Sequence, residues 1–250
     1  ATGARTTARA AVRPPEAAPE PRERILQAAS GAIAAHGFHG MSMRELARAA
    51  GMSLSNLYNY FPSKEEILFA LQKEAFEVLV TSAEDALRRL DPEAGYPLRA
   101  AGATPDARLY VLISHHVAYV AERPDVMRVL VHEAATLPAP RRRAVRRLKE
   151  RYFRLARGIV EELVGPAWTG DGADPAELDR VTYNLFGMLN WIYGWYDPAL
   201  HGPPRELART IHRIALCGVV SQCPFRDLQE RLDENLAAMD RRPLLGGASP

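Results

Sequence analysis

Arginine side chains gather in one stretch of the sequence, between residues 141 and 157. Guanidinium groups make paired hydrogen bonds to phosphate oxygens, so this stretch suits a phosphorylated ligand or nucleic acid. Helical spacing places Arg147 and Arg151 beside the apolar stripe of the same segment, within reach of a ligand that enters between helices. A solvated helix face is the plainer interpretation of these charges. The stretch therefore leaves three uses open: a ligand phosphate, a second nucleic-acid surface, and a solvated face.

The sequence lacks the motifs of catalytic chemistry. No GxSxG, GxGxxG, phosphate-binding loop or DxD pair occurs in it. The segment that begins with His132 and Glu133 is not a zinc-binding HExxH motif, because position 136 is threonine. The two cysteines, Cys217 and Cys223, do not have the paired spacing of zinc ligands. We expect no enzyme activity, no metal site and no cofactor.

The composition is that of an ordinary water-soluble protein. Hydrophobic residues make up 47% and charged residues 25% of the 250 positions, and the formal net charge is +2. The longest strongly apolar stretch, residues 185–196, is shorter than the roughly 20 residues that span a bilayer. We expect a cytoplasmic protein without a membrane partner.

Three serines each stand where a short helix should begin. Ser42 is followed three residues later by Glu45, which is the spacing of a capping box, and Ser63 has the same relation to Glu66. Ser53 lies between them, directly after an Ala-Ala-Gly-Met turn. Helix starts this close together predict very short helices, and two short helices joined by a tight turn form a helix-turn-helix.

The remaining sequence has helical periodicity and no alternating strand pattern, so we predict an all-α fold. One of the expected helices begins after residue 174 and runs towards Tyr196. We divide the chain into an arm without stable structure at 1–20, a three-helix head with the helix-turn-helix at 21–68, a helical bundle at 69–220, and an additional helix with a flexible tail at 221–250.

The segment from Met43 to Glu66 reads MRELARAAGMSLSNLYNYFPSKEE, and it resembles the DNA-binding signature of the TetR family. The AAG turn, the LYNYF sequence and the PSKEE that follows are specific in combination. The resemblance implies a DNA-binding head, and it makes the helical bundle an effector and dimerisation domain. It further implies a homodimeric, ligand-responsive repressor of palindromic operator DNA, joined through its last two core helices and associated with the nucleoid.

On this resemblance, the second short helix enters the major groove. Asn56 suits a bidentate contact with adenine, and Leu54 suits packing on a thymine methyl. The family positions of Tyr58 and Tyr60 imply hydroxyl contacts with phosphate. The predicted DNA-binding set is Ser42, Arg44, Ser53, Leu54, Ser55, Asn56, Tyr58, Tyr60 and Lys64. The serines serve equally well as helix caps, and the tyrosines as packing residues.

A second resemblance covers residues 187–198, GMLNWIYGWYDP, and the PRELA that follows. This region is similar to the C-terminal part of TetR-family members that control fatty acid, sterol or aromatic catabolism, several of which are released from DNA by acyl-CoA thioesters. The implied acyl-CoA effector would bind at His116, Arg147, Arg151, Trp191 and Trp195. Dimer packing for the tryptophans and a structural role for the histidine are alternatives. A non-CoA apolar effector, and a DNA-binding scaffold without any effector, also stay open.

Overall fold

The computed structural model describes residues 19–90, 104–168 and 175–219, and within these ranges all regular structure is helical. The elements in chain order are α1 (Pro21–Gly40), α2 (Met43–Ala49), α3 (Leu54–Tyr60), α4 (Lys64–Arg88), α5 (Pro105–Glu122), α6 (Pro124–His132), α7 (Ala139–Trp168), α8 (Pro175–Asn190), the 3-10 turn η2 (Ile192–Gly194), α9 (Pro198–His201) and α10 (Pro204–Val219). The all-α prediction is confirmed. The predicted arm, apart from residues 19 and 20, and the predicted helix and tail at 221–250 lie outside the described residues.

Helices α1, α2 and α3 form a small head, and local hydrogen bonds set the helix starts. The Ser42 hydroxyl accepts from the Glu45 amide, and the Glu45 carboxylate accepts in turn from the Ser42 amide. Ser53 and Ser63 cap α3 and α4 through the same hydroxyl contact with an amide three residues on. Gly51 has a φ of +66° in the turn between α2 and α3, a conformation that favours glycine. The predicted helix-turn-helix is therefore present.

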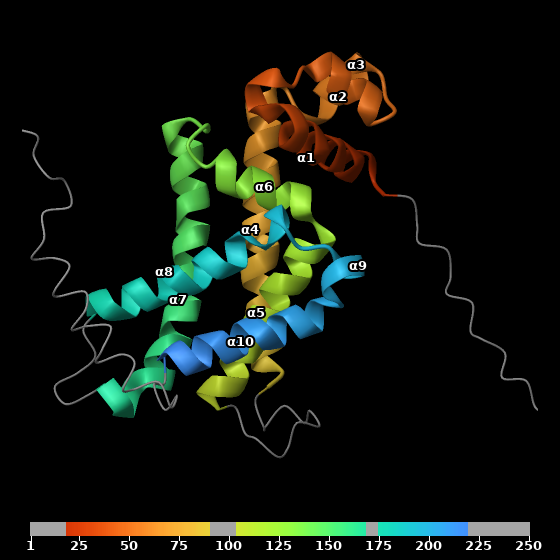
Figure 1. The fold of residues 1–250 in the computed structure, drawn as a ribbon. Helices are drawn as coiled ribbons and strands as arrows, with labels where there is room; N and C mark the ends of the chain where they lie inside the picture. Colours follow the sequence, from red (N-terminus) through yellow and green to blue (C-terminus); the bar gives the residue numbers. More distant parts are fainter. Residues whose placement is uncertain (1–18, 91–103, 169–174, 220–250) are drawn as a thin grey trace, which may run out of the picture.

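The long helix α4 belongs to two hydrophobic cores. Its first turns place Ile67, Leu68 and Leu71 in a core shared with the three head helices. Its later turns place Leu79 and Val80 in the core of the helical bundle. Figure 1 shows α4 running from the head down into the bundle without interruption. The division expected at residue 68 thus falls inside a continuous helix, and side chains from α6 and α7 complete the head core: Val129 and Val145, together with Leu137 between them.

Helix α5 lies at the centre of the bundle. It packs against α4, α6, α7, α8, η2 and α10, and Leu109, Leu112, Ile113 and Val117 along it are buried. A helix that buries apolar residues on several faces forms the interior of a helical domain rather than its surface. Among the residues that the structure describes, no helix combines the length and the apolar character needed to cross a bilayer.

The region after α8 differs from the expected continuous helix. Helix α8 ends at Asn190, and the chain then turns through η2 before α9 begins. Asp197 caps α9 by accepting from the Ala199 amide at 2.8 Å, and Pro198 occupies the first position of that helix. Proline lacks an amide proton and disfavours helix in the residue before it, so α9 begins at Pro198 as a separate helix from the one that ends at Asn190. The expected helical run towards Tyr196 was therefore wrong at its end.

Candidate nucleic-acid interface and ligand cavity

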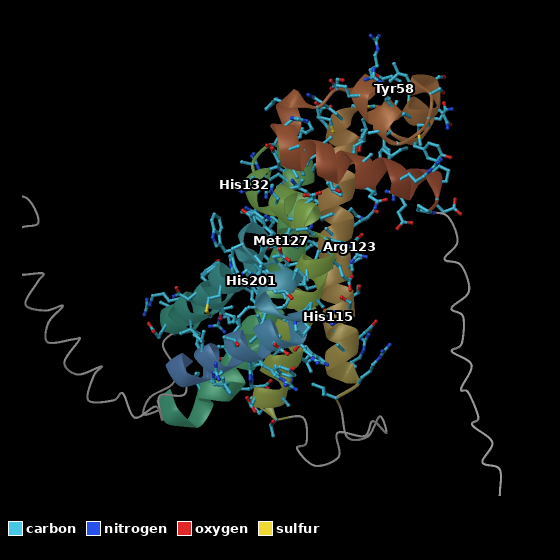
Figure 2. The ribbon with its side chains drawn as sticks, turned by 45° about the vertical axis from the view of Figure 1, so that its right-hand side comes forward. Tyr58, His115, Arg123, Met127, His132 and His201 are labelled. Atoms are coloured by element: carbon cyan, nitrogen blue, oxygen red, sulfur yellow. The ribbon has the colours of Figure 1, made fainter. Side chains whose placement is uncertain are left out.

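Helix α3 is anchored by buried apolar side chains and leaves its polar ones exposed. Leu57 is fully buried, and Phe61, directly after the helix, is 5% exposed. Asn56 is exposed, and Tyr58 and Tyr60 expose 47% and 41% of their surface. Figure 2 places Tyr58 at the outer end of the head, away from the bundle. An exposed polar helix of this kind has the size and the hydrogen-bonding groups that a DNA major groove accepts.

The N-cap and first turn of α3 contain three more of the predicted contact residues. The Ser53 hydroxyl accepts from the Asn56 amide at 3.1 Å, while Ser55 is exposed and Leu54 is half-buried. A hydroxyl that accepts a hydrogen bond in a cap keeps its own proton for a second contact. Capping and contact with a partner are thus compatible at Ser53.

Ser42 and Arg44 lie on the head surface at the start of α2, where both are exposed. The Ser42 hydroxyl is 2.7 Å from the Glu45 carboxylate. Hydrogen bonds from Ser42 hold the pKa of the Glu45 carboxyl below its ordinary value, because they stabilise the charged form. The structure therefore gives Ser42 a definite capping role.

Lys64 is directed back onto the head. Its ammonium lies 4.8 Å from the centre of the Phe38 ring and 3.4 Å from the Phe38 carbonyl oxygen. The Met41 carbonyl oxygen is 3.5 Å away. These contacts tie the start of α4 to the connection between α1 and α2, and they engage the ammonium group of a residue in the predicted DNA-binding set.

A cavity of about 600 Å³ opens within the bundle, between α4, α5, α6, α7 and α8. Its apolar wall consists of Phe76, Leu79, Met127, Leu130, Val131, Phe153 and Phe186, with the rings of Tyr152 and Tyr183 beside them. Cavities of this size and character are typical of small-molecule sites. The largest share of the lining residues comes from α7, the arginine-rich helix.

One buried polar pair lies in the cavity wall. His116 Nδ1 and the Tyr152 hydroxyl are 3.2 Å apart, at hydrogen-bond distance, and both residues are almost fully buried. His116 Nε2 has no hydrogen-bond partner among the described residues. Burial lowers the pKa of His116 to about 4 and raises the pKa of Tyr152, because a low-dielectric environment disfavours the charged forms. The pair is therefore neutral at physiological pH.

The cavity also has a basic rim, formed by Arg146, Lys149 and Arg154 together with the carboxylate of Glu150. Lys149 lies 5.1 Å from the centre of the Phe76 ring, and burial lowers its pKa. Arg146 pairs with Glu150 across one helical turn at 3.2 Å. Arg154 is exposed and forms no ion pair with the residues that the structure describes. An anionic group at this rim would meet more positive than negative charge.

The five predicted effector residues do not come together at this cavity. Of the five, His116 lines it, whereas both arginines and both tryptophans lie outside its lining. Arg151 instead forms a two-pronged ion pair with Glu84 of α4, with N–O distances of 2.8 and 2.6 Å. Trp191 and Trp195 are largely exposed beyond the end of α8. Sequence reasoning did not select the basic residues that do line the cavity, which are Arg146, Lys149 and Arg154. It also missed Phe153, although its position next to Tyr152 on the apolar stripe could have indicated it.

A network of side chains joins the bundle to the head at the end of α6. The Glu133 carboxylate accepts from the Phe38 amide at 3.0 Å and from the Thr136 hydroxyl at 2.6 Å. Gln72 of α4, which is buried, donates to the Glu133 carbonyl at 2.9 Å. Helix α6 therefore contacts the cavity through Met127 and the head through its last residues, and Figure 2 shows His132 on the head side of Met127.

Two protein families match different parts of the chain. Residues 25–71 match the family described as bacterial regulatory proteins, tetR family. Residues 102–219 match the family described as the tetracyclin repressor-like C-terminal domain. The two matches do not overlap, and they coincide with the helix-turn-helix head and with the part of the bundle that contains most of the cavity.

Individual proteins are similar over most of the chain. A fatty acid metabolism regulator protein of Bacillus subtilis (strain 168) is 25% identical over 166 residues, which cover 66% of this chain and 78% of that protein. The crystal structure of the TetR-family regulator PfmR from Thermus thermophilus has a TM-score of 0.62 at 27% identity, over 77% of this chain and 97% of that one. A structure of FadR from Bacillus subtilis in complex with stearoyl-CoA shares the fold, with a TM-score of 0.58 at 22% identity over 79% of this chain and 98% of that one.

Proposed function

The chain belongs to the TetR family of bacterial transcriptional regulators, and from this premise we propose that it is a homodimeric repressor of palindromic operator DNA, released by an acyl-CoA thioester. The observation that carries the proposal is the exposed polar face of α3, held by buried Leu57, on a chain that also contains a large cavity. In this proposal residues 21–68 bind DNA, residues 69–220 bind effector and partner, and the protein acts at the nucleoid in the cytoplasm.

The DNA contacts that we propose divide into reading and positioning contacts. Asn56 and Leu54 contact base edges, where an amide and an apolar group discriminate between bases. Tyr58 and Tyr60 contact phosphate oxygens through their hydroxyls, which positions the helix without reading sequence. Smaller positioning contacts come from Ser42, Arg44, Ser53 and Ser55. Lys64 contributes positive charge to DNA binding at the base of the head, where its ammonium also contacts the Phe38 and Met41 carbonyl oxygens.

The dimer forms through exposed faces of α8 and α10. Tyr183 exposes 65% of its surface and Ile214 exposes 53%, and Trp191 is also exposed. Gly187 has no atom within 4 Å of the position a Cβ would take, so another backbone can approach there. Apolar side chains on a helical face of this kind are stabilised by a second copy, which removes them from water. Replacing Ile214 by glutamate should shift the protein to a monomer in light-scattering measurements and abolish tight operator binding.

The cavity supports an acyl-CoA effector through its two kinds of lining. The apolar wall suits an acyl group, and Arg146, Lys149 and Arg154 at the rim suit the phosphates of coenzyme A. The name of the Bacillus subtilis relative, a fatty acid metabolism regulator, favours the same ligand class. The stearoyl-CoA complex of the similar structure indicates that the shared fold has room for such a ligand.

Release from DNA requires that the cavity and the head communicate. Met127, Leu130 and Val131 of α6 line the cavity, and Glu133 directly after α6 bonds to the head. A ligand that displaces α6 would alter this bond and with it the spacing of the two heads in the dimer. Two heads must fit successive major grooves about 34–36 Å apart, so a change in spacing weakens binding. Operator and effector then weaken each other by the same factor.

A gel-shift titration tests the proposal. The probe is DNA from immediately upstream of this gene and its neighbours, and the effectors are CoA thioesters of increasing chain length, with free coenzyme A as the control. We expect saturable release by at least one thioester. Lys149→Met should raise the required concentration about tenfold, because one charge-assisted hydrogen bond is lost. Lys73→Met, at a surface lysine that pairs with Glu77, is the matched control and should not change it.

Three outcomes would contradict parts of the proposal. Failure of every upstream fragment to bind would refute the repressor. Operator binding that no CoA thioester weakens would refute the acyl-CoA effector but not the repressor function. In that case a saturable thermal shift with a neutral apolar compound would identify a non-CoA effector, and the absence of any shift would favour a DNA-binding scaffold.

A further inference from the structure

The cavity wall is rich in rings around one polar pair. The Tyr152 ring lies 5.9 Å from the His116 ring, in a stacked arrangement, and 5.4 Å from the Phe186 ring. Phe153 lies 6.2 Å from Phe186 and 4.5 Å from Tyr183. All five residues line the cavity, which places an aromatic surface and a buried hydrogen-bonding group in the same wall.

The unpartnered nitrogen of His116 is the feature that points to a ligand. Buried polar atoms in folded proteins almost always have a hydrogen-bond partner, and an unpaired one is destabilising. His116 is 1% exposed, its Nδ1 is satisfied by Tyr152, and its Nε2 is not satisfied by any described residue. His116 lines the cavity, and a ligand there would supply the missing group by reaching Nε2, an atom with almost no exposed surface.

The geometry points to an effector whose acyl group carries a hydroxylated ring, with the hydroxyl bonded to His116 Nε2 and the ring packed against Phe153 and Phe186. This inference rests on the acyl-CoA function proposed above and names the class of acyl group. It makes His116 the residue that determines specificity, and it excludes saturated straight chains as the preferred ligand.

A hydroxyl fits the histidine better than other oxygen groups do. The imidazole is neutral, so Nε2 is a donor when Tyr152 donates to Nδ1, and an acceptor when Nδ1 carries the proton. A hydroxyl can accept or donate, and it satisfies both tautomers, whereas a carbonyl oxygen satisfies only the first. A carboxylate would bring a charge into the buried wall at a large desolvation cost.

A ring fits the wall better than a saturated chain of similar size does. Aromatic pairs in offset or edge-to-face geometry gain more than area burial alone provides, by about two- to tenfold in affinity for each pair. The Phe153 ring is inclined by 28° to the Phe186 ring and by 32° to the Tyr183 ring, and the Phe186 ring is inclined by 55° to the Tyr152 ring. Rings at such different angles offer a planar ligand both faces and edges. A flexible chain also loses more conformational freedom when it is bound.

The test compares four thioesters on the full-length protein by isothermal titration calorimetry: phenylacetyl-CoA, its 3-hydroxy and 4-hydroxy derivatives, and octanoyl-CoA. We expect one hydroxylated ring to bind about tenfold more tightly than phenylacetyl-CoA, since the analogue without the hydroxyl leaves Nε2 unpaired. Phenylacetyl-CoA should in turn bind more tightly than octanoyl-CoA. Equal or tighter binding of octanoyl-CoA, or no gain from either hydroxyl, would overturn the inference.

Variants at two histidine–tyrosine pairs assign the effect to His116. His116→Leu should reduce the gain from the hydroxyl to about onefold while phenylacetyl-CoA still binds, and His116→Gln, which keeps a polar group near the Nε2 position, should restore part of it. The matched control is His132→Leu, because His132 Nε2 also bonds a tyrosine hydroxyl, that of Tyr193 at 2.7 Å, outside the cavity lining. A gain that persists in His116→Leu would refute the assignment. If His116→Leu fails to fold, His116→Gln and the wild-type comparison still decide.

The four thioesters also separate this inference from the broader function. Operator release by octanoyl-CoA or a longer chain, without any response to the hydroxylated rings, would refute the ring class and leave the acyl-CoA proposal intact. Absence of operator release and of binding by every CoA thioester would refute the acyl-CoA proposal, and this inference with it.

Discussion

The head and the ligand cavity are assembled over very different distances in the sequence. In the head, Ser42 and Ser53 set helix starts through hydrogen bonds to residues three positions away. The cavity is lined by side chains that extend from Phe76 to Asn190 and come from five helices. A helix cap needs only a few suitable residues close together in the sequence, whereas the cavity depends on the way in which several long helices pack against one another. The DNA-binding part can therefore be recognised from sequence, and the effector part can vary widely on the same scaffold.

The strongest test of this contrast removes one fully buried leucine from each part. Leu57→Ala in the head and Leu112→Ala in the bundle should each cost about 2–5 kcal/mol of local stability, from lost burial and a residual cavity. We expect Leu57→Ala to abolish operator binding while effector binding survives, and Leu112→Ala to weaken effector binding. Hydrogen exchange would locate the destabilised region. Equal loss of effector binding in both variants would show that the two parts are not separable.

Acidification should affect the two parts through different groups. The pKa of His116 is lowered to about 4 in the folded chain, whereas its ordinary value is 6.5. Between these two pH values the unfolded chain binds a proton at this histidine and the folded chain does not. The stability that depends on neutral His116 is present above pH 6.5 and is lost as the pH falls towards 4. Between pH 7 and pH 5 we expect the wild type to lose on the order of 2 kcal/mol more than His116→Leu does, measured by urea denaturation. Parallel pH profiles would contradict the buried neutral histidine.

Within the head, reading and positioning contacts should respond differently to substitution. Asn56→Ala should change base preference at one operator position, with a loss of about tenfold on the preferred base. Tyr58→Phe should weaken binding to a smaller and similar extent on all sequences, because it removes a phosphate contact. Binding to a library of single-base operator variants measures both. A uniform effect of Asn56→Ala across that library would remove its proposed reading role.

The smallest expected effect concerns the caps. Ser53→Ala should cost about 1 kcal/mol, since the Asn56 amide loses its acceptor. Ser42→Ala should in addition change the pH dependence, because Ser42 keeps the pKa of Glu45 low. Stabilisation by a lowered carboxyl pKa is present above the unfolded-state value and is lost as the pH falls through the folded-state value. Thermal melts from about pH 7 to about pH 3 should therefore show the difference between Ser42→Ala and wild type narrowing at the acid end, where only the loss of the hydroxyl cap remains.

The sequence predicted the features that depend on near neighbours. The three serine caps, the tight turn at Gly51 and the all-helical fold follow from residues only a few positions apart. It did not predict which face of α7 meets the cavity. Arg146 and Arg147 are adjacent in the sequence, and only the packing of α7 against α4 and α8 decides that Arg146 lines the cavity and Arg147 does not. The end of α8 was also misjudged, since apolar residues continue past Asn190 into η2 and the apolar pattern alone does not show where the helix stops.

Helix α4 has a consequence for protein engineering. Ile67, Leu68 and Leu71 of α4 belong to the head core, and so do Val129, Leu137 and Val145 from later in the chain. No single cut in the chain therefore yields a DNA-binding module with its core intact. A hybrid regulator that borrows this head would have to be spliced within α4 after Leu71, and the recipient sensor would need three apolar side chains of matching shape to close it. Exchange of sensors among relatives is thus constrained at a handful of interior positions that line neither the proposed DNA surface nor the cavity.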